Sequence, residues 1–452
     1  MSSEPRFRVA ICGAGIGGLT AALALSRSPD IEVQVYEGAQ KLAELGAGIG
    51  LFSRPWELIR KLGLDTELLK YTEIKPVEGP VTAFNYRKSD TPEGIEFYTL
   101  VTKGNLMTFH RPDFQNALLQ NMPRSTRIHC SKRLRSYIQR PTGPVELYFE
   151  DGTTATCDIL IGADGLKSAV RRSMYTEKAR IAQSEQKMRE AVECEASIEP
   201  VWSGTNAYRA LIPAERLSAR YPGHRPAMDT DAFFRRYQYL GKDGYVIAYP
   251  IAKGKFINFV AFKSRHDLEG TKFNGPWVSP SDSSEVTSMF RTWEPEVQAL
   301  MDCIERPLRW SIHIIRPLST YVHGRVALIG DAAHASPPHQ GSGAGQAIED
   351  AFVLATLLNH PSTNRHNLSR ALGIFDHVRR PVAHDVHERN RLNGQYFTFH
   401  HTSPSEELSL SPEEKLRRLK ELGETFTKNW EWAWMTSAEP VVREALQLLN
   451  QS

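Results

Sequence analysis

The sequence is poor in cysteine, has no long apolar run and carries no large excess of charge of either sign. Its 452 residues include five cysteines, none in a CxxC pair, which argues against a zinc site and against a disulfide scaffold. The net charge of +3 comes without a basic stripe of interleaved aromatic residues, so nucleic acid is not an expected partner. The short basic segment Lys132-Arg133-Leu134-Arg135 is interpreted as the solvated end of a strand.

The chain also lacks the run of about 18 apolar residues from which a membrane span would be predicted. Its first residues, Met1 to Arg6, are polar and show no signal-peptide pattern. We therefore expect a cytoplasmic protein, and widely spaced free thiols suit a reducing compartment. A hydrophobic content of 41% allows a large core in two or three domains.

Glycine is concentrated near the start of the chain. The apolar run Phe7 to Cys12 predicts a strand, and the GAGIGG segment at 13–18 leads from it into a predicted helix. In such a turn Gly13 permits the sharp bend, Gly15 lets a pyrophosphate approach the backbone, and Gly18 lets the helix lie close to the strand.

The next predicted strand, Ile31 to Tyr36, ends at Glu37. An acid at this position, roughly 20 residues after the turn, is placed to bind a ribose hydroxyl. The combination predicts a dinucleotide site, and the alternative is a glycine-rich turn without function. A further glycine-rich turn, Ala47 to Leu51, suggests backbone passing near a flat group.

The segment Gly324 to Leu358 resembles the first motif in construction. A short apolar strand, Val326 to Ile329, ends at Gly330-Asp331, and a Pro- and Gly-rich loop leads to a helix that begins near Gly345. Two turns of this kind, far apart in the chain, suggest that both wrap around one large cofactor.

Other elements are predicted more simply. Arg111-Pro112 opens a helix, and Arg111 is either a phosphate contact or a solvated helix start. Asp151-Gly152 is a hairpin turn, and residues 190–265 are mostly strand. The remaining predictions are a helix at 288–303, a helix at 366–400 that kinks or ends at Arg379-Arg380-Pro381, and two tail helices at 412–449 broken near 430–437.

Three motifs stand in order, GAGIGG at 13–18, IGADGLKSAVR at 161–171 and GRVALIGDAAHASPPHQGSGAGQAIEDA at 324–351. Together they resemble the group A flavoprotein aromatic hydroxylases, and among these the fungal salicylate-hydroxylase-like enzymes, over residues 7–395. The resemblance implies an α/β fold with a Rossmann-like FAD-binding domain of the glutathione-reductase/p-hydroxybenzoate-hydroxylase type. The expected division is an FAD-binding domain at 1–75, 105–185 and 305–395, a mainly β substrate domain at 76–104 and 186–304, and a helical C-terminal segment at 396–452.

The resemblance also implies which residues hold FAD. The pyrophosphate is expected at the glycine turn, the adenosine ribose at Glu37, and a ribityl hydroxyl at Asp331. Loop residues near the second helix are expected beside the flavin ring, where helix N–H groups stabilise negative charge on the reduced ring. The full set is Gly13, Gly15, Gly18, Glu37, Arg111, Asp164, Gly165, Asp331, Pro338, Gly341 and Gly343.

The family chemistry is monooxygenation with NADH or NADPH as co-substrate and O2 as oxidant. A flavin C4a-hydroperoxide delivers one oxygen atom to a phenolic aromatic acid of the salicylate or 4-hydroxybenzoate type, with or without oxidative decarboxylation. Alternatives are a hydroxylase or epoxidase of a larger polyketide or terpenoid substrate, and a non-catalytic FAD-fold binding protein. A plain NAD-dependent dehydrogenase leaves the late motif unexplained. The resemblance is compatible with a monomer or a homodimer.

Three residues of the β region are the catalytic candidates. Arg209 is placed to face a carboxylate or phenolate, and Tyr249 matches a pocket tyrosine of the relatives. Tyr245 stands where several relatives have histidine, and a phenol with a pKa near ~10 relays a proton but is a poor base. Packing in the core is the alternative for both tyrosines, and exposure is the alternative for Arg209. His334 and His339 either approach the ring, cap their loop or are solvated.

Overall fold

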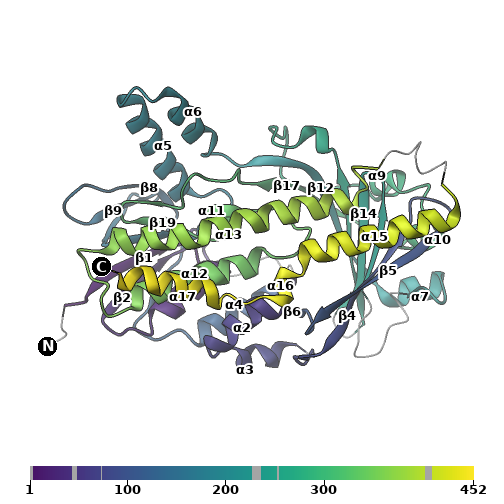
Figure 1. Cartoon of the computed structure of the whole chain (residues 1–452), viewed down its shortest axis with the longest axis horizontal. Helices are drawn as coiled ribbons and strands as arrows, with labels where there is room; N and C mark the ends of the chain where they lie inside the picture. The colour runs from purple at the N-terminus through teal and green to yellow at the C-terminus, as the bar shows by residue number, and fades with distance from the viewer. Residues whose placement is uncertain are drawn as a thin grey trace.

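The computed structural model describes residues 4–42, 48–72, 74–225, 236–251, 254–402 and 410–451. Two sheets lie at opposite ends of an elongated molecule, and two long helices run along it between them (Figure 1). The described chain is therefore a mixed α/β protein with a helical C-terminal region, as predicted.

The first sheet has six strands, and β1 lies near its centre. This strand is an almost continuous apolar run, as expected for a strand buried on both faces. It pairs in parallel with β2 and β11, so the carboxyl ends of all three strands meet at one edge. In spatial order the strands are β18 (Val322–His323), β19 (Val326–Leu328), β11 (Ile159–Gly162), β1 (Phe7–Cys12), β2 (Ile31–Tyr36) and β7 (Arg127–His129).

The helices that follow these strands share one hydrophobic core with the sheet. Helix α1 (Ile16–Leu25) packs against α12 (Gly343–Asn359), so the helices after the two glycine-rich motifs lie side by side. The other helices of this half are α2 (Ser53–Lys61), α3 (Asp65–Leu68), the 3-10 turn η1 (Leu69–Tyr71), α4 (Arg111–Gln120), α5 (Ala169–Ser184), α6 (Met188–Ala196) and α11 (Asp331–His334).

The second sheet has eight strands and two different faces. In spatial order the strands are β16 (Val278–Pro280), β17 (Leu308–Ile314), β12 (Val201–Pro213), β15 (Phe256–Ser264), β14 (Gly244–Ile251), β13 (Tyr237–Gly241), β4 (Pro80–Lys88) and β5 (Ile95–Lys103). One face packs its own apolar core against α7 (Ala214–Arg220), α9 (Ser283–Met289) and α10 (Pro295–Met301). The 3-10 turn η2 (His266–Leu268) follows β15.

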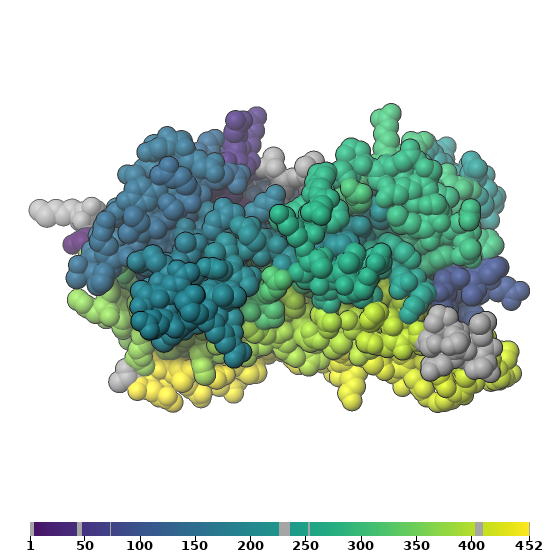
Figure 2. Space-filling view, turned by 90° about the horizontal axis from the view of Figure 1, so that it is seen from above, coloured from purple at the N-terminus to yellow at the C-terminus, as the bar shows by residue number. Residues whose placement is uncertain are grey.

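The opposite face carries an aromatic core that reaches the C-terminal helices. Helix α13 (Leu368–Phe397) and α15 (Pro412–Trp430) run beside each other along the molecule, followed by α16 (Trp432–Met435) and α17 (Glu439–Asn450). Tyr86 illustrates the contact, because its ring centroid lies 4.5 Å from that of Phe426. In the space-filling view the yellow C-terminal segment covers one long edge of the molecule (Figure 2).

Two smaller sheets complete the strands. The hairpin at Asp151-Gly152 is confirmed, and it lies in the three-stranded sheet β10 (Thr154–Cys157), β9 (Val145–Phe149) and β8 (Leu134–Ile138). A two-stranded sheet pairs β3 (Gly48–Leu51) with β6 (Met107–His110). The predicted turn at 47–51 is therefore wrong for Gly48–Leu51, which is a strand, while Ala47 lies outside the described residues.

Two further predictions need correction, and two hold with small differences. The helix expected at 288–303 is two helices, α9 and α10, because Pro295 disfavours helical backbone at the residue before it. Of the kink or end predicted at Arg379-Arg380-Pro381, the end is wrong, because helix α13 continues through Pro381. Pro381 lies on the exposed side of the helix, as does His377, whose carbonyl receives no helical N–H because proline lacks one. Helix α12 begins at Gly343, slightly earlier than predicted. Finally, residues 190–265 include α6 and α7 besides strands.

The domain division remains a prediction, with one conflict. Strand β17 pairs with β12 in the eight-stranded sheet, although the predicted boundary at 305 assigns it to the other domain. Its hydrogen-bonding partner lies about a hundred residues earlier in the chain, so local sequence gives no signal of the pairing. Among the described residues, none of the helices combines the length and apolar character needed to cross a bilayer.

Candidate active site

The carboxyl ends of the parallel strands open into a cavity of about 760 Å³. Its walls come from both glycine-rich motifs, from the turn after β11, from β3 and from α4. Ten of the eleven residues predicted to hold the cofactor line it: Gly13, Gly15, Glu37, Arg111, Asp164, Gly165, Asp331, Pro338, Gly341 and Gly343. The structure therefore brings together residues that are more than 300 positions apart in the chain.

The eleventh residue, Gly18, does not line the cavity but packs against the backbone of the glycine turn. A Cβ on Gly18 would lie 2.0 Å from the carbonyl oxygen of Gly13, so only glycine allows this close packing. Gly13 itself has φ of +103°, and a Cβ there would lie 2.3 Å from the carbonyl oxygen of Ala163. Gly15 is the N-cap of α1 and supplies no side-chain cap, so the first N–H groups of that helix remain available to a phosphate.

Two acids fix the backbone around this turn. Glu37 accepts the N–H of Ala14 at 2.8 Å and the N–H of Ala39 at 2.7 Å. Asp164 accepts the N–H of Ala169 at 2.7 Å and also a hydrogen bond from Ser168. Burial raises the pKa of Asp164, and these hydrogen bonds act in the opposite direction. Its carboxylate thus caps α5, and the cavity receives mainly the backbone of the Asp-Gly turn.

The second motif presents a carboxylate directly to the cavity. Gly330 adopts φ of +58° and turns the chain, so that Asp331 begins α11 with its side chain exposed. Burial lowers the pKa of Arg111, and the nearby charge of Asp331 opposes that shift, which places the two groups close together. Gly330 also donates its N–H to the buried Asp350 at 2.9 Å.

The loop before α12 completes the wall. Pro338, Gly341 and Gly343 are exposed to the cavity, and a Cβ on either glycine would meet no atom within 4 Å. Helix α12 starts at Gly343 without an acidic residue in its first turn and without a side-chain cap. Its N-terminal N–H groups are therefore a second place where negative charge is stabilised.

The basic segment Lys132-Arg133-Leu134-Arg135 is more than the solvated strand end predicted from its sequence. It lines the cavity together with Lys167 and Arg172, instead of being only a solvated strand end. A Cβ on Gly38 would lie 2.9 Å from Cζ of Arg133, so the segment packs against the end of β2. The three cationic side chains of the segment were the sequence feature that could have indicated a binding site. Contacts between segments far apart in the chain bring them to this edge of the sheet, and these contacts are not evident from the sequence.

The predicted catalytic residues project from the face of the eight-stranded sheet that carries the aromatic core, and none of the three lines the cavity. A Cβ built on Gly48 would lie 3.9 Å from the hydroxyl of Tyr249, so this phenol reaches β3 at the cavity wall. Arg209 is half-buried, and its guanidinium lies 6.0 Å from the ring centroid of Trp310. Burial raises the pKa of Tyr249, while the charges of Arg236 and Arg209 lower it, so all three lie close together.

Arg236 was missed in the sequence. It is 8% exposed, and its charge acts on the hydroxyl of Tyr249. The ladder between β13 and β14 pairs Tyr237 with Ala248, which places Arg236 opposite Tyr249. Burial lowers the pKa of this guanidinium. In the sequence, the only sign of this site is an arginine at the start of a strand rich in aromatic residues. The pairing of that strand with β14, which brings Arg236 to Tyr249, cannot be inferred from the sequence.

Tyr245 has a different neighbourhood from Tyr249. It is fully buried, its ring stacks on Phe262 with centroids 4.4 Å apart, and its hydroxyl is hydrogen-bonded to Nδ1 of His339 at 2.7 Å. Burial raises the pKa of Tyr245 well above its usual value and lowers that of His339 to about 3. His334 points to Asp350, with Nε2 at 2.5 Å from Oδ2. Both histidines therefore fasten their loop from within the protein.

The buried imidazole predicts an acid-labile fold. The pKa of His339 is 6.5 in an unfolded chain and about 3 in the folded protein. Between these values the unfolded state binds the extra proton, so the free energy of unfolding falls as the pH falls below 6.5. The wild-type protein therefore loses free energy of unfolding between pH 7.5 and pH 4.5. We expect this loss to be smaller by about 3 kcal/mol in His339→Asn, as measured by urea unfolding at the two pH values. Equal losses in both proteins would refute this assignment.

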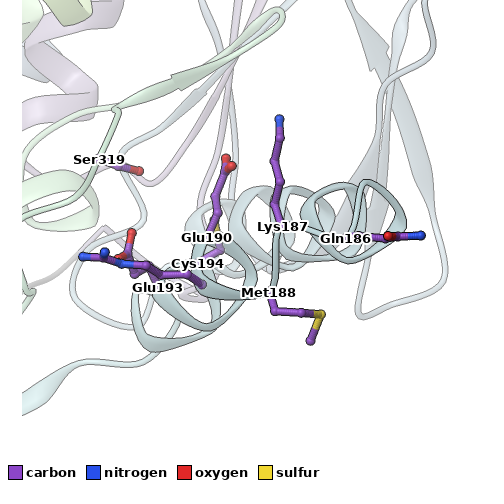
Figure 3. A pocket seen from close by; sticks show the side chains of 8 residues that line it. Gln186, Lys187, Met188, Glu190, Glu193, Cys194 and Ser319 are labelled. Carbon is purple, nitrogen blue, oxygen red and sulfur yellow. The ribbon is translucent and has the colours of Figure 1, made fainter.

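A second cavity, of about 660 Å³, lies at the projecting hairpin of α5 and α6 (Figure 3). Lys187, Met188 and Gln186 point away from one another in this view, so their polar groups do not converge on one ligand. Cys194 is buried, and burial raises its pKa, so it is not an activated thiolate. The chemistry of the molecule is therefore concentrated in the first cavity.

Comparisons with known proteins agree with this geometry. A family model described as an FAD binding domain matches residues 6–221 and 306–390. The chain is 34% identical to the FAD-dependent monooxygenase str9 of Strobilurus tenacellus, over 100% of this chain and 99% of that protein. It is 32% identical to a salicylate hydroxylase of Pseudomonas putida, over 98% of this chain and 95% of that protein.

A solved structure of a salicylate hydroxylase–substrate complex has the same fold. It superposes with a TM-score of 0.78 at 31% identity and covers 98% of both chains. The family model ends at residue 390, whereas these full-length likenesses extend through the C-terminal helices.

Proposed function

The chain belongs to the FAD-dependent monooxygenases of the salicylate hydroxylase type, and we propose that it hydroxylates a phenolic aromatic acid. FAD is its cofactor, and a reduced nicotinamide and O2 are its co-substrates. Membership sets aside the alternatives of a non-catalytic FAD-fold protein and of a plain NAD-dependent dehydrogenase.

The residues of the cavity fit FAD. A dinucleotide carries a pyrophosphate, and the wall offers the open N-terminus of α1 beside a turn in which glycine leaves room for close approach. Basic side chains at the wall, among them Arg111 and Arg133, match the negative charge. We assign the pyrophosphate to Gly13, Gly15 and the start of α1.

The two carboxylates of the wall have different tasks in this assignment. Glu37 already accepts two backbone N–H groups, which fixes its orientation, and its free lone pairs accept a ribose hydroxyl. Asp331 has its side chain exposed in the cavity and accepts a ribityl hydroxyl. Pro338, Gly341 and Gly343 then lie beside the flavin ring, where the start of α12 stabilises negative charge.

Arg236 is the observation that carries the substrate assignment. Burying a guanidinium that is 8% exposed costs free energy that an anion can offset, and a substrate carboxylate would supply this anion. A planar aromatic carboxylate matches its fork of donors. Arg209 adds a second positive charge beside Tyr249. We therefore place the substrate carboxylate at Arg236, between the sheet and β3.

The hydroxyl of the substrate needs a partner on the same face. Gln238 is 1% exposed, and its Oε1 has no hydrogen-bond partner among the described residues. It lies two residues from Arg236 and opposite Ile247 on β14, so alternation puts it on the substrate face. Gln238 accepts the phenolic hydrogen bond and Tyr249, whose raised pKa keeps it protonated, donates one. These contacts orient the ring and polarise its hydroxyl.

When bound, FAD reduced by the nicotinamide would supply the activated oxygen that is inserted into the ring. Attack at a ring carbon that bears hydrogen gives a hydroxylated acid, and the displaced hydrogen leaves as a proton. Attack at the carbon that bears the carboxylate gives a phenol and releases CO2. In both cases the second oxygen atom leaves as water with the two electrons from the nicotinamide. Apolar walls such as Val260 and Ile247 limit access of water to the site.

The test is to purify the protein, record its visible spectrum and follow NADH and NADPH oxidation over a panel of hydroxybenzoates. We expect flavin absorbance, substrate-stimulated oxidation and a hydroxylated product, with CO2 measured to separate the two routes. Neutral phenols and larger polyketide phenols serve as comparison substrates. Turnover confined to the larger phenols would refute the assignment of a small aromatic acid.

A further inference from the structure

The wall beside the flavin ring is held by residues outside the three motifs. We define the ring loop as residues 336–343, of which Ser336, Pro337, Pro338, Gly341, Ser342 and Gly343 line the cavity. The two other residues, His339 and Gln340, turn away from it and are 8% and 1% exposed. A loop with a cavity-lining side and a fully buried side is positioned by whatever binds the buried side.

Gln340 uses its whole side chain in this way. Its Oε1 accepts the indole N–H of Trp432 at 3.2 Å, and its Nε2 donates to the carbonyl of Asn429 at 3.3 Å. The same Nε2 donates to the carbonyl of Arg389 at 3.2 Å. Thus one side chain of the ring loop is bound between α13 and the C-terminal end of α15.

Helix α13 also holds the ring loop by hydrogen bonds of Asn390. The backbone N–H of Gln340 donates to Oδ1 of Asn390 at 2.9 Å, and Nδ2 of Asn390 donates to Oγ of Ser342 at 2.8 Å. Asn429 in turn donates to the carbonyl of Arg389 at 2.8 Å. The ring loop, α13 and the end of α15 therefore form one hydrogen-bonded unit whose bonds are buried or partly buried.

We propose that the C-terminal helices, Pro412–Asn450, are part of the flavin site, with Gln340 and Trp432 as the positioning residues that hold the ring loop against the flavin. This inference rests on the proposed assignment of the ring loop to the flavin. It gives a function to a segment beyond residue 390, where the family model ends. Within this segment α16 packs against α2, and α17 packs against α12 and α13 near the first sheet (Figure 1).

The physical consequence concerns the reduced flavin. Backbone N–H groups at the start of α12 stabilise its negative charge only while the ring loop keeps them in place. Loosening the loop weakens FAD binding and makes reduction of the flavin less favourable. A purely structural role of Trp432 would change neither property in the folded protein.

The experiment uses the full-length holoenzyme and three variants. Trp432→Phe removes one hydrogen-bond donor, and Gln340→Met removes the side-chain hydrogen bonds while keeping its length. Trp430→Phe is the matched control, since the buried indole N–H of Trp430 has no hydrogen-bond partner among the described residues. FAD dissociation constants come from flavin fluorescence, and midpoint potentials come from dye-coupled reduction.

We expect Trp432→Phe to weaken FAD binding about 3- to 10-fold, the range for one net hydrogen bond, and Gln340→Met to weaken it further. Both variants should have a more negative midpoint potential than the wild type and than Trp430→Phe. Wild-type affinity and potential in the first two variants, or equal changes in the control, would overturn this inference alone. Failure of the wild type to bind FAD would overturn the proposed function with it.

Discussion

Replacing Arg379 with methionine is expected to lower the free energy of unfolding by about 3–5 kcal/mol. Arg379 is completely buried, and its guanidinium donates to Asp350 at 2.9 Å, to Gln346 at 2.9 Å and to Glu349. Arg54 makes a bidentate pair with the same Glu349 at 2.7 and 2.9 Å. Removing Arg379 takes one buried cation from both carboxylates, so that Asp350 retains only His334 and Glu349 retains only Arg54.

The effect should extend to the cofactor. Burial alone raises the pKa of Asp350, but the charges of His334 and Arg379 outweigh it, so the pKa is lowered to about 2. The resulting carboxylate accepts the N–H of Gly330, the residue that turns the chain into Asp331. Without Arg379 this carboxylate binds a proton more readily and holds the turn less firmly. We therefore expect weaker FAD binding as well as lower stability.

The neighbouring residue provides a matched control. Arg380 pairs with Asp376 one helical turn away at 3.2 Å, and its side chain is 31% exposed. Such pairs contribute about 0–1 kcal/mol, so Arg380→Met should shift the urea midpoint little. The urea midpoints of both variants are compared with that of the wild type at pH 7. The comparison requires that the dependence of the unfolding free energy on urea concentration is the same in all three proteins. Equal shifts for the two variants would mean that the buried cluster is not what stabilises this half of the molecule.

The sequence predicts those parts of the fold that depend on neighbouring residues. The turn at Gly13 was predictable, because a tight bend, a close helix and an acid such as Glu37 at fixed spacing are all local requirements. The hairpin at Asp151-Gly152 is local in the same sense. The late Gly330-Asp331 turn was predictable from the strand before it and the helix after it.

Residues whose surroundings come from distant segments were not predictable. Arg236 owes its burial to a ladder with β14, and Tyr245 owes its histidine partner to a loop 94 residues away. Helix α13 continues through Pro381 because that side of the helix is exposed, a fact absent from the sequence. The cluster of Arg54, Glu349, Asp350 and Arg379 likewise joins three separate helices.

The second large effect is expected at the substrate. Arg236→Gln should lower kcat/KM for an aromatic acid about 30- to 1,000-fold, which corresponds to about 2–4 kcal/mol. The reason is that the substrate carboxylate must still leave water but no longer meets a guanidinium. The loss should be almost absent for an analogue in which an amide replaces the carboxylate, because that ring makes no ionic contact with residue 236. FAD content should be unchanged, since Arg236 does not line the cavity assigned to FAD.

Two further variants separate charge from geometry at this position. Arg236→Lys retains the charge but not the planar fork, so we expect it to recover only part of the loss. Arg209→Gln removes the half-buried neighbour, which lies over Trp310, and should cost less than Arg236→Gln. The measurement is kcat/KM for the aromatic acid and for its amide, in the wild type and in the three variants. An equal loss on both substrates in Arg236→Gln would show that residue 236 shapes the sheet and does not bind the carboxylate, since an ionic contact discriminates between the two rings and a packing defect does not.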